Sequence, residues 1–354
     1  MWRVMPGAAA HRPERRAVFR NAMRGLAGAL LGGAALWLVL RDVQWGAVRA
    51  VLAGVDAGLC ALAVLSIFVT LGMLALRWQL LFYPEHRERS WRALLAGIVV
   101  SQMLNILSPV RLFVGEVVRV YAAGHSEGLS KLRVLGTLGA EKAADLAAFS
   151  ISLLLLAGTL PPPVLELLPG WLRRASLGIV AFTLVLVAAV AGPPLWRWLE
   201  RRAFFLPQSW AAWVGESVRT TLAGLAALRH AGMALAIAGI SLLVLALSMG
   251  TNYLLLKAFG FPLGWSAALL ILVWHQVGDA LPALPAKMGM HQLLTVTALS
   301  LLGIDWNAAT GYAIVLYVVA LGPKLLLGGV ILAAGNWMPL LRAEYASARA
   351  ALRA

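Results

Sequence analysis

The chain has 354 residues, of which 61% are hydrophobic and only 13% are charged, and its mean hydropathy is +0.82. Soluble domains carry about 25% charged residues, so the composition excludes an ordinary soluble protein and indicates an integral membrane protein. The formal net charge is +15. The basic residues are spread over short segments between apolar runs, which fits contact with anionic lipid headgroups better than nucleic-acid binding.

Six apolar segments are long enough to cross a bilayer as helices, which takes roughly 20 residues. In chain order these predicted spans are Ala22–Leu40, Leu59–Phe82, Val134–Leu160, Ala175–Trp196, Ala231–Leu256 and Ala308–Ala333. We expect one membrane domain over residues 22–333, preceded by a basic tail (1–21) and followed by a second tail (334–354). Residues 203–230 are interpreted as an amphipathic stretch on the membrane interface.

Two further apolar segments are interrupted by proline. Ala93–Ala123 is broken at Ser108-Pro109, and Ser266–Leu302 is broken at Pro282 and Pro285. Irregular backbone at membrane depth is tolerated where protein buries it. We therefore predict two re-entrant helical hairpins.

The distribution of basic residues sets the orientation. Of the 30 Lys and Arg residues, 20 fall in segments on the side of the N-terminus and five on the opposite side. Basic loops face the cytoplasm, so both termini are expected there, in a bacterial inner membrane. The two hairpins then enter from opposite sides, and residues 59–160 and 231–333 form an inverted repeat. The predicted fold is all-α, with about six full transmembrane helices and two opposed re-entrant hairpins.

A short motif in the first hairpin recurs in the second. Pro109-x-Arg111 is followed by Glu116, and Pro285-x-Lys287 by Gln292, a shift of 176 residues (285 − 109). Ionisable groups inside an apolar chain are costly and mark functional sites by default. Inverted repeats of this kind build the midplane binding sites of many secondary transporters.

The candidate substrate-binding residues fall into three clusters, and in each a structural alternative stays open. They are Asn105, Pro109, Arg111, Glu116 and Arg119 in the first hairpin; Glu141 and Asp145 in the third span; and Asp279, Pro285, Lys287 and Gln292 in the second hairpin.

In the first cluster, a helix N-terminus and a guanidinium together suit a phosphate-sized anion. Alternatively, Arg111 and Glu116 only neutralise each other. Glu141 and Asp145 share a helical face, where they face Arg111 or Lys142, relay protons, or belong to an interfacial charge cluster. Arg77 is expected to extend to the membrane surface.

In the second hairpin, His275 lies four residues before Asp279 and forms either a proton-accepting pair with it or an interior hydrogen bond. No HExxH, GxSxG or phosphate-loop motif occurs, and the single cysteine excludes an intrachain disulfide. We expect no enzyme activity, no cofactor and no metal site.

The chain resembles the membrane domain of bacterial lysylphosphatidylglycerol synthases and their stand-alone, flippase-like relatives, from about Leu59 to Ala333. The resemblance rests on Arg77-Trp78, Asn105, Pro109-x-Arg111, Gly115-Glu116, Arg119, Tyr121, Glu141-Lys142-x-x-Asp145 and Pro282-x-x-Pro285-x-x-x-Gly289. It implies handling of aminoacylated phospholipids, lipid-linked sugars or hopanoid-related lipids. The synthases also carry a soluble catalytic domain that is not in this sequence, so the resemblance implies no aminoacyl transfer. Ala286, Lys287 and Gln292 depart from the family's glycines and glutamate, which favours an anionic ligand.

The sequence therefore predicts translocation of a lipid or lipid-linked substrate, with an anionic headgroup bound by the hairpin cations Arg111 and Lys287. Partners would be an anionic phospholipid or a lipid-linked substrate, and no nucleic acid. A first alternative is a non-transporting subunit that presents lipid to a separate synthase or glycosyltransferase. A second is a small-solute or proton-coupled transporter.

Overall fold

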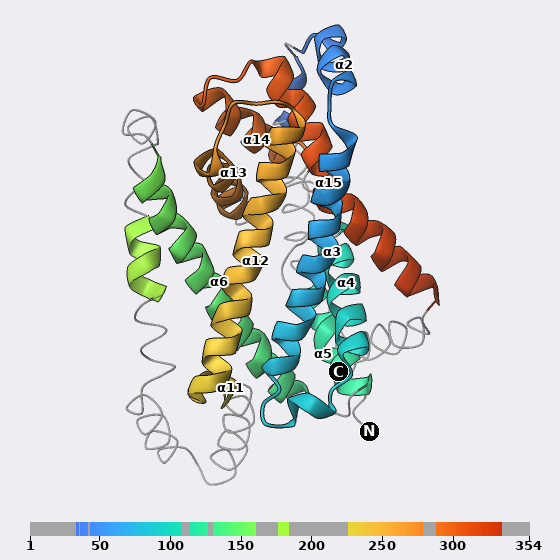
Figure 1. Ribbon diagram of the computed structural model, residues 1–354. Coiled ribbons are helices and arrows are strands. Elements are labelled where there is room, and N and C mark those ends of the chain that lie inside the picture. Colours follow the sequence, from blue (N-terminus) through green and yellow to red (C-terminus); the bar gives the residue numbers. More distant parts are fainter. Residues whose placement is uncertain are drawn as a thin grey trace, which may run out of the picture.

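The computed structural model describes residues 33–34, 36–41, 43–107, 114–126, 130–160, 176–183, 226–278 and 288–334. Within these ranges, every regular element is a helix (Figure 1). Four of the described helices are long and apolar enough to cross a membrane: α3 (Ala57–Leu80), α6 (Lys131–Thr159), α12 (Ala231–Ala258) and α15 (Trp306–Ala334). The protein is thus embedded in the membrane and crosses it several times.

These four helices confirm four of the predicted spans, and their ends lie within three residues of the predicted ones. The predicted spans Ala22–Leu40 and Ala175–Trp196 fall mostly outside the described residues, although 36–40 and 176–183 are helical. The predicted amphipathic stretch is described only from residue 226, where the short helix α11 (Ala226–Arg229) begins.

Each proline-interrupted segment contains two shorter helices. The first pair is α4 (Trp91–Leu107) and α5 (Val114–Ser126), and the second is α13 (Trp265–Gly278) and α14 (Met290–Leu301). The two pairs lie at opposite ends of the long helices (Figure 1). The proline-containing breaks, 108–113 and 279–287, lie outside the described residues.

The same order of helices occurs twice along the chain. The starts of α3, α4, α5 and α6 are shifted by 174, 174, 176 and 175 residues from those of α12, α13, α14 and α15. The central pair, α3 and α12, is antiparallel, because the N–H of Asp56 before α3 donates to the carbonyl of Ala258 at the end of α12. In the flanking contacts, α4 packs on α15 and α13 packs on α6.

Glycines set the closest approaches between helices. A Cβ on Gly115 of α5 would lie 2.5 Å from the Ser101 carbonyl oxygen of α4, and one on Gly278 of α13 would lie 2.1 Å from Leu294 Cδ1 of α14. Small residues let backbones approach closely in membrane proteins. The absence of a side chain at these two glycines therefore allows α5 to pack closely on α4 and α13 to pack closely on α14.

Two short helices were not predicted from the sequence. Helix α2 (Trp45–Ala53) packs on α15, and the 3₁₀ helix η1 (Glu85–Glu88) connects α3 to α4. The side chain of Asp56 accepts from the Leu59 N–H at 3.0 Å and caps the start of α3. The short segment 54–56 separates α2 from the span α3.

Candidate functional site

A buried ionic cluster joins α3, α5 and α6. Arg119 of α5 and Glu141 of α6 form two parallel bonds, with Nη1–Oε1 at 3.0 Å and Nη2–Oε2 at 2.5 Å. The two residues are only 5% and 8% exposed. This bidentate geometry is the strongest form of an arginine–carboxylate pair.

The Arg119 guanidinium also lies over an aromatic ring. Its Cζ is 4.1 Å from the centre of the Trp78 ring of α3, and Trp78 Nε1 donates to Thr137 Oγ1 of α6 at 3.2 Å. A desolvated cation over indole is worth about 2 kcal/mol. Trp78 thus contacts the face of the Arg119 guanidinium, while Glu141 bonds its N–H groups.

Arg77 contradicts its sequence-based interpretation. It was expected to extend to the membrane surface, yet it is 2% exposed and donates from Nη2 to Asp145 Oδ1 of α6 at 2.6 Å. Its Nη1 donates to Ser241 Oγ of α12 at 3.2 Å. Both partners lie on neighbouring spans, so the local sequence does not reveal that Arg77 is paired in the interior.

Lys142 connects this cluster to the first helix pair. Its Nζ lies 3.5 Å from Glu116 Oε1 of α5 and 4.0 Å from Asp145 Oδ2. Asn105 of α4 accepts from the Gly115 N–H at 2.9 Å and donates to Glu116 Oε2 at 3.4 Å. Asn105 therefore caps the start of α5 and holds the carboxylate that faces Lys142.

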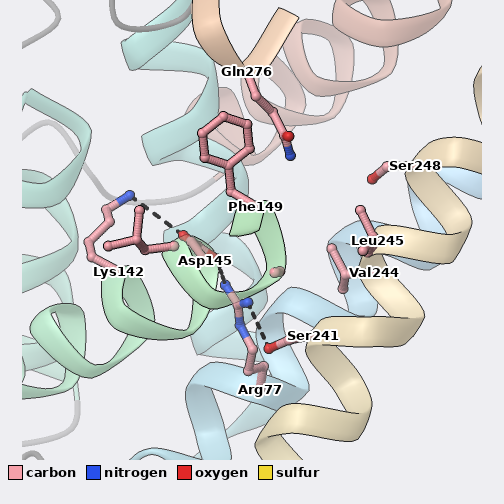
Figure 2. Close-up of a pocket in the computed structure, with 11 residues that line it drawn as sticks. Arg77, Lys142, Asp145, Phe149, Ser241, Val244, Leu245, Ser248 and Gln276 are labelled. Atoms are coloured by element: carbon pink, nitrogen blue, oxygen red, sulfur yellow. Dashed lines mark hydrogen bonds and ion pairs between the residues drawn. The ribbon is translucent and has the colours of Figure 1, made fainter. Parts of the chain in front are cut away.

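A polar pocket of about 420 Å³ opens beside the cluster. Its lining comes from α3, α6, α12 and α13: Arg77, Lys142, Asp145, Leu146, Ala148, Phe149, Ser241, Val244, Leu245, Ser248 and Gln276. Figure 2 shows Lys142 and Asp145 on one side and the α12 side chains on the other. Asp145 lies at the middle of the 29-residue α6, so the pocket lies far from both ends of that span.

An apolar groove of about 360 Å³ adjoins the pocket. It runs between α6 and α12, and Ala148 and Ser241 line both spaces. The remaining lining is Ala143, Ala144, Ala147, Ile151, Leu228, Ala234, Ile237, Ala238 and Leu242. The charged pocket and the apolar groove therefore lie next to each other, with two lining residues in common.

The structure brings together five of the predicted site residues: Asn105, Glu116, Arg119, Glu141 and Asp145. Glu141 and Asp145 meet Arg119 and Arg77, so the expected facing partner Lys142 is only one of three cations around them. Predicted residues Pro109, Arg111, Asp279, Pro285 and Lys287 lie outside the described residues. A meeting of the two hairpin tips stays a prediction.

Gln292 lies apart from the charged pocket. It is the third residue of α14, and its Oε1 accepts from the Gly289 N–H at 2.8 Å. Glu116, its counterpart in the motif, is also the third residue of its helix. The Gln292 side chain thus hydrogen-bonds the backbone at the start of its own helix. The Glu116 carboxylate instead faces Lys142.

The predicted interior hydrogen bond of His275 is present. Its Nε2 lies 2.8 Å from Thr295 Oγ1 of α14, and the His275 and His291 rings are 4.1 Å apart between centres. The His291 ring meets Tyr317 of α15 edge-on at 5.3 Å. These contacts join α13, α14 and α15.

Sequence reasoning missed Ser241 and Gln276 as pocket residues and placed Arg77 outside the site. Arg77 carried the signal that would have found it, because it is an arginine in an apolar segment. Ser241 carried none, since serines are common packing residues in membrane helices.

A family model for the lysylphosphatidylglycerol synthase TM region matches residues 25–328. The chain belongs to this family. The match covers all the residues that form the ionic cluster, the polar pocket and the apolar groove. A search of curated proteins gives no match for the chain. Membership places the protein among membrane proteins of lipid biosynthesis or translocation.

Proposed function

We propose that this family member binds a membrane lipid or lipid-linked substrate by an anionic phosphate of its headgroup and translocates that headgroup across the bilayer. The observation that carries the proposal is the pocket itself. A charged cavity lies among spans, halfway along α6, and an apolar groove adjoins it and shares two of its lining residues. A lipid uses a charged surface for its headgroup and an apolar surface for its chain. A small polar solute needs only the charged surface.

The cost of burying charge supports a functional role for the pocket. An ion in a low-dielectric interior costs several kcal/mol unless it is well paired. Arg77 and Arg119 are buried and paired, but the side chains of Lys142 and Asp145 are 58% and 43% exposed. The paired residues hold the cluster in place, and the open ones are accessible to a headgroup.

The repeated helix order supports the transport mechanism that we propose. Two helix pairs at opposite ends of an antiparallel core resemble the inverted repeats from which many alternating-access transporters are built. In this proposal the pairs are re-entrant hairpins of an inverted repeat, with both termini in the cytoplasm of a bacterial cell. Arg111 and Lys287 bind the phosphate in turn as the headgroup moves from one side to the other.

The test is a translocation assay with the full chain in vesicles that contain a short-chain fluorescent phospholipid. Translocation is read from the fraction of label that an impermeant quencher reaches with time. The Arg111→Ala, Lys287→Ala double variant is compared with Arg201→Ala, Arg202→Ala, which removes the same charge elsewhere. We expect loss of translocation only in the first variant.

Unchanged rates in the Arg111, Lys287 variant would overturn the role of the hairpin cations. A wild-type protein that moves no lipid, together with a growth or lipid defect caused by the Arg201, Arg202 variant, would favour the non-transporting subunit. The translocation assay and the growth or lipid measurement together therefore separate the two functions.

A further inference from the structure

The ionic cluster beside the polar pocket is electrically neutral. Among the described residues it holds three cations, Arg77, Arg119 and Lys142, and three carboxylates, Glu116, Glu141 and Asp145. A ligand with a net charge would leave that charge unbalanced beside a partly buried ionic cluster, which is costly. A ligand that is itself neutral overall but carries both charges avoids this cost.

The pocket presents one member of each sign to a ligand. The side chains of Arg77, Arg119 and Glu141 are at most 10% exposed, whereas Lys142 and Asp145 are open to the cavity. Lys142 Nζ and Asp145 Oδ2 are 4.0 Å apart and both line the pocket (Figure 2). An anion and a cation side by side on one headgroup complement this pair.

Neutral polar groups face the same space. Ser248 offers a hydroxyl, and Gln276 offers an amide whose Oε1 accepts from Ser152 Oγ at 3.3 Å. The bond to Ser152 orients the amide and leaves its NH₂ as a donor. These groups suit the neutral oxygens of a phosphodiester and of an ester linkage.

The groove gives the ligand its apolar part. Its floor is rich in small side chains, among them Ala143, Ala147, Ala234 and Ala238. Because these alanines of α6 and α12 are small, a groove remains between the two helices. Its volume is typical of ligand sites. Ala148 and Ser241 line both spaces, so the groove is close enough to the pocket for the apolar part of a ligand whose headgroup lies in the pocket.

We propose that this joint site takes a zwitterionic phospholipid, with its phosphate at Lys142, its ammonium at Asp145 and one acyl chain in the groove between α6 and α12. The inference rests on the proposed function and narrows its substrate class. The lipid enters sideways from the bilayer, since the groove lies between two spans.

The experiment is native mass spectrometry of the full chain released from lipid nanodiscs. The discs contain equal amounts of a phosphoethanolamine lipid, which is zwitterionic, and a phosphoglycerol lipid, which is anionic, with identical acyl chains. We expect the protein to retain the zwitterionic lipid preferentially, by about fivefold, the factor that roughly 1 kcal/mol of charge pairing gives.

Two charge variants are expected to move this preference in opposite directions. Asp145→Asn makes the cluster positive and lowers the ratio of zwitterionic to anionic lipid. Lys142→Gln makes it negative and raises the ratio, and Lys142 is exposed enough to be replaced without loss of folding. If either residue had a purely structural role, the two substitutions would not change the ratio of zwitterionic to anionic lipid in opposite directions.

The groove is tested by Ala238→Trp, which fills it. Leu235→Trp on the same helix is the matched control, because Leu235 is 75% exposed and does not line the groove. We expect lipid loss only in Ala238→Trp. Preferential retention of the anionic lipid by the wild type would overturn this inference and leave the proposed function standing. Retention of neither lipid would contradict both.

Discussion

Arg77 of α3 and Asp145 of α6 form an ion pair between two membrane spans, with Nη2 and Oδ1 2.6 Å apart. Arg77 also lies 3.8 Å from Glu141 Oε1 and donates to Ser241 of α12. One guanidinium therefore ties three candidate spans together at the wall of the pocket. Arg77 therefore fixes the position of Asp145 in the wall of the pocket.

Replacement of Arg77 by alanine should destabilise the protein strongly. It leaves the buried Glu141 and the half-buried Asp145 with one fewer cation, and removing one partner of a buried pair costs about 3–5 kcal/mol. The measurement is thermal or denaturant unfolding of the purified chain in detergent. Arg87→Ala, an exposed position in η1, is the control and should change stability little. Equal unfolding of the two variants would mean that the ion pair contributes nothing measurable.

The Arg119–Glu141 pair should show strong energetic coupling in a double-mutant cycle. Arg119→Met and Glu141→Gln each leave a buried partner without its bidentate bonds. The double variant removes both sides of the interaction, so its cost should fall short of the sum by about 1–3 kcal/mol. Unfolding free energies of the four proteins give the coupling directly. Additive costs would show that the two side chains act independently.

Gly115→Ala should loosen the first helix pair. The added Cβ would lie 2.5 Å from the Ser101 carbonyl oxygen and 2.6 Å from Asn105 Nδ2, both closer than contact distance. Overpacking of this kind costs typically about 1–3 kcal/mol. Gly139→Ala in α6 is the control, because nothing lies within 4 Å of its added Cβ. We expect a lower unfolding temperature for the first variant only, and equal temperatures would refute the close contact.

Stability should depend on pH through Glu85 at the end of the protein where η1 lies. Arg133 hydrogen-bonds the Glu85 carboxylate and holds its pKa below the usual value. A carboxyl with a lowered pKa in the folded state stabilises the protein above the pKa of the unfolded state, about 4.3. That contribution is lost as the pH falls through the folded pKa.

Unfolding curves between pH 7 and pH 3 check this expectation. Glu85→Gln should reduce the loss of stability on acidification, whereas Glu88→Gln, exposed in the same 3₁₀ helix, should not. If the Glu85 variant keeps the full pH dependence of the wild type, the ion pair with Arg133 does not contribute to it.

The sequence was most informative where a signal is local. Uninterrupted apolar length located α3, α6, α12 and α15, because a span must satisfy its backbone within about 20 residues. The motif around Asn105, Gly115 and Glu116 pointed to a site, and these residues do meet through hydrogen bonds. In each case the deciding residues lie within one continuous segment of about 12 to 30 residues.

The sequence was least informative where partners are distant along the chain. Arg77 pairs with Asp145, 68 residues away, and with Ser241, 164 residues away. No periodicity encodes those contacts, so the local pattern favoured an arginine at the membrane surface. The apolar groove was equally hidden, since its alanines are ordinary membrane-helix residues and only the approach of α6 to α12 gives them a shape.

The most direct test of lipid translocation compares the full wild-type chain in vesicles with vesicles that contain no protein and with Lys142→Gln. Transfer of a labelled phospholipid between leaflets is followed at equal protein-to-lipid ratio. We expect fast transfer with the wild type and clearly slower transfer with Lys142→Gln, because Lys142 is the exposed cation of the pocket. Wild-type transfer no faster than in protein-free vesicles would contradict this expectation.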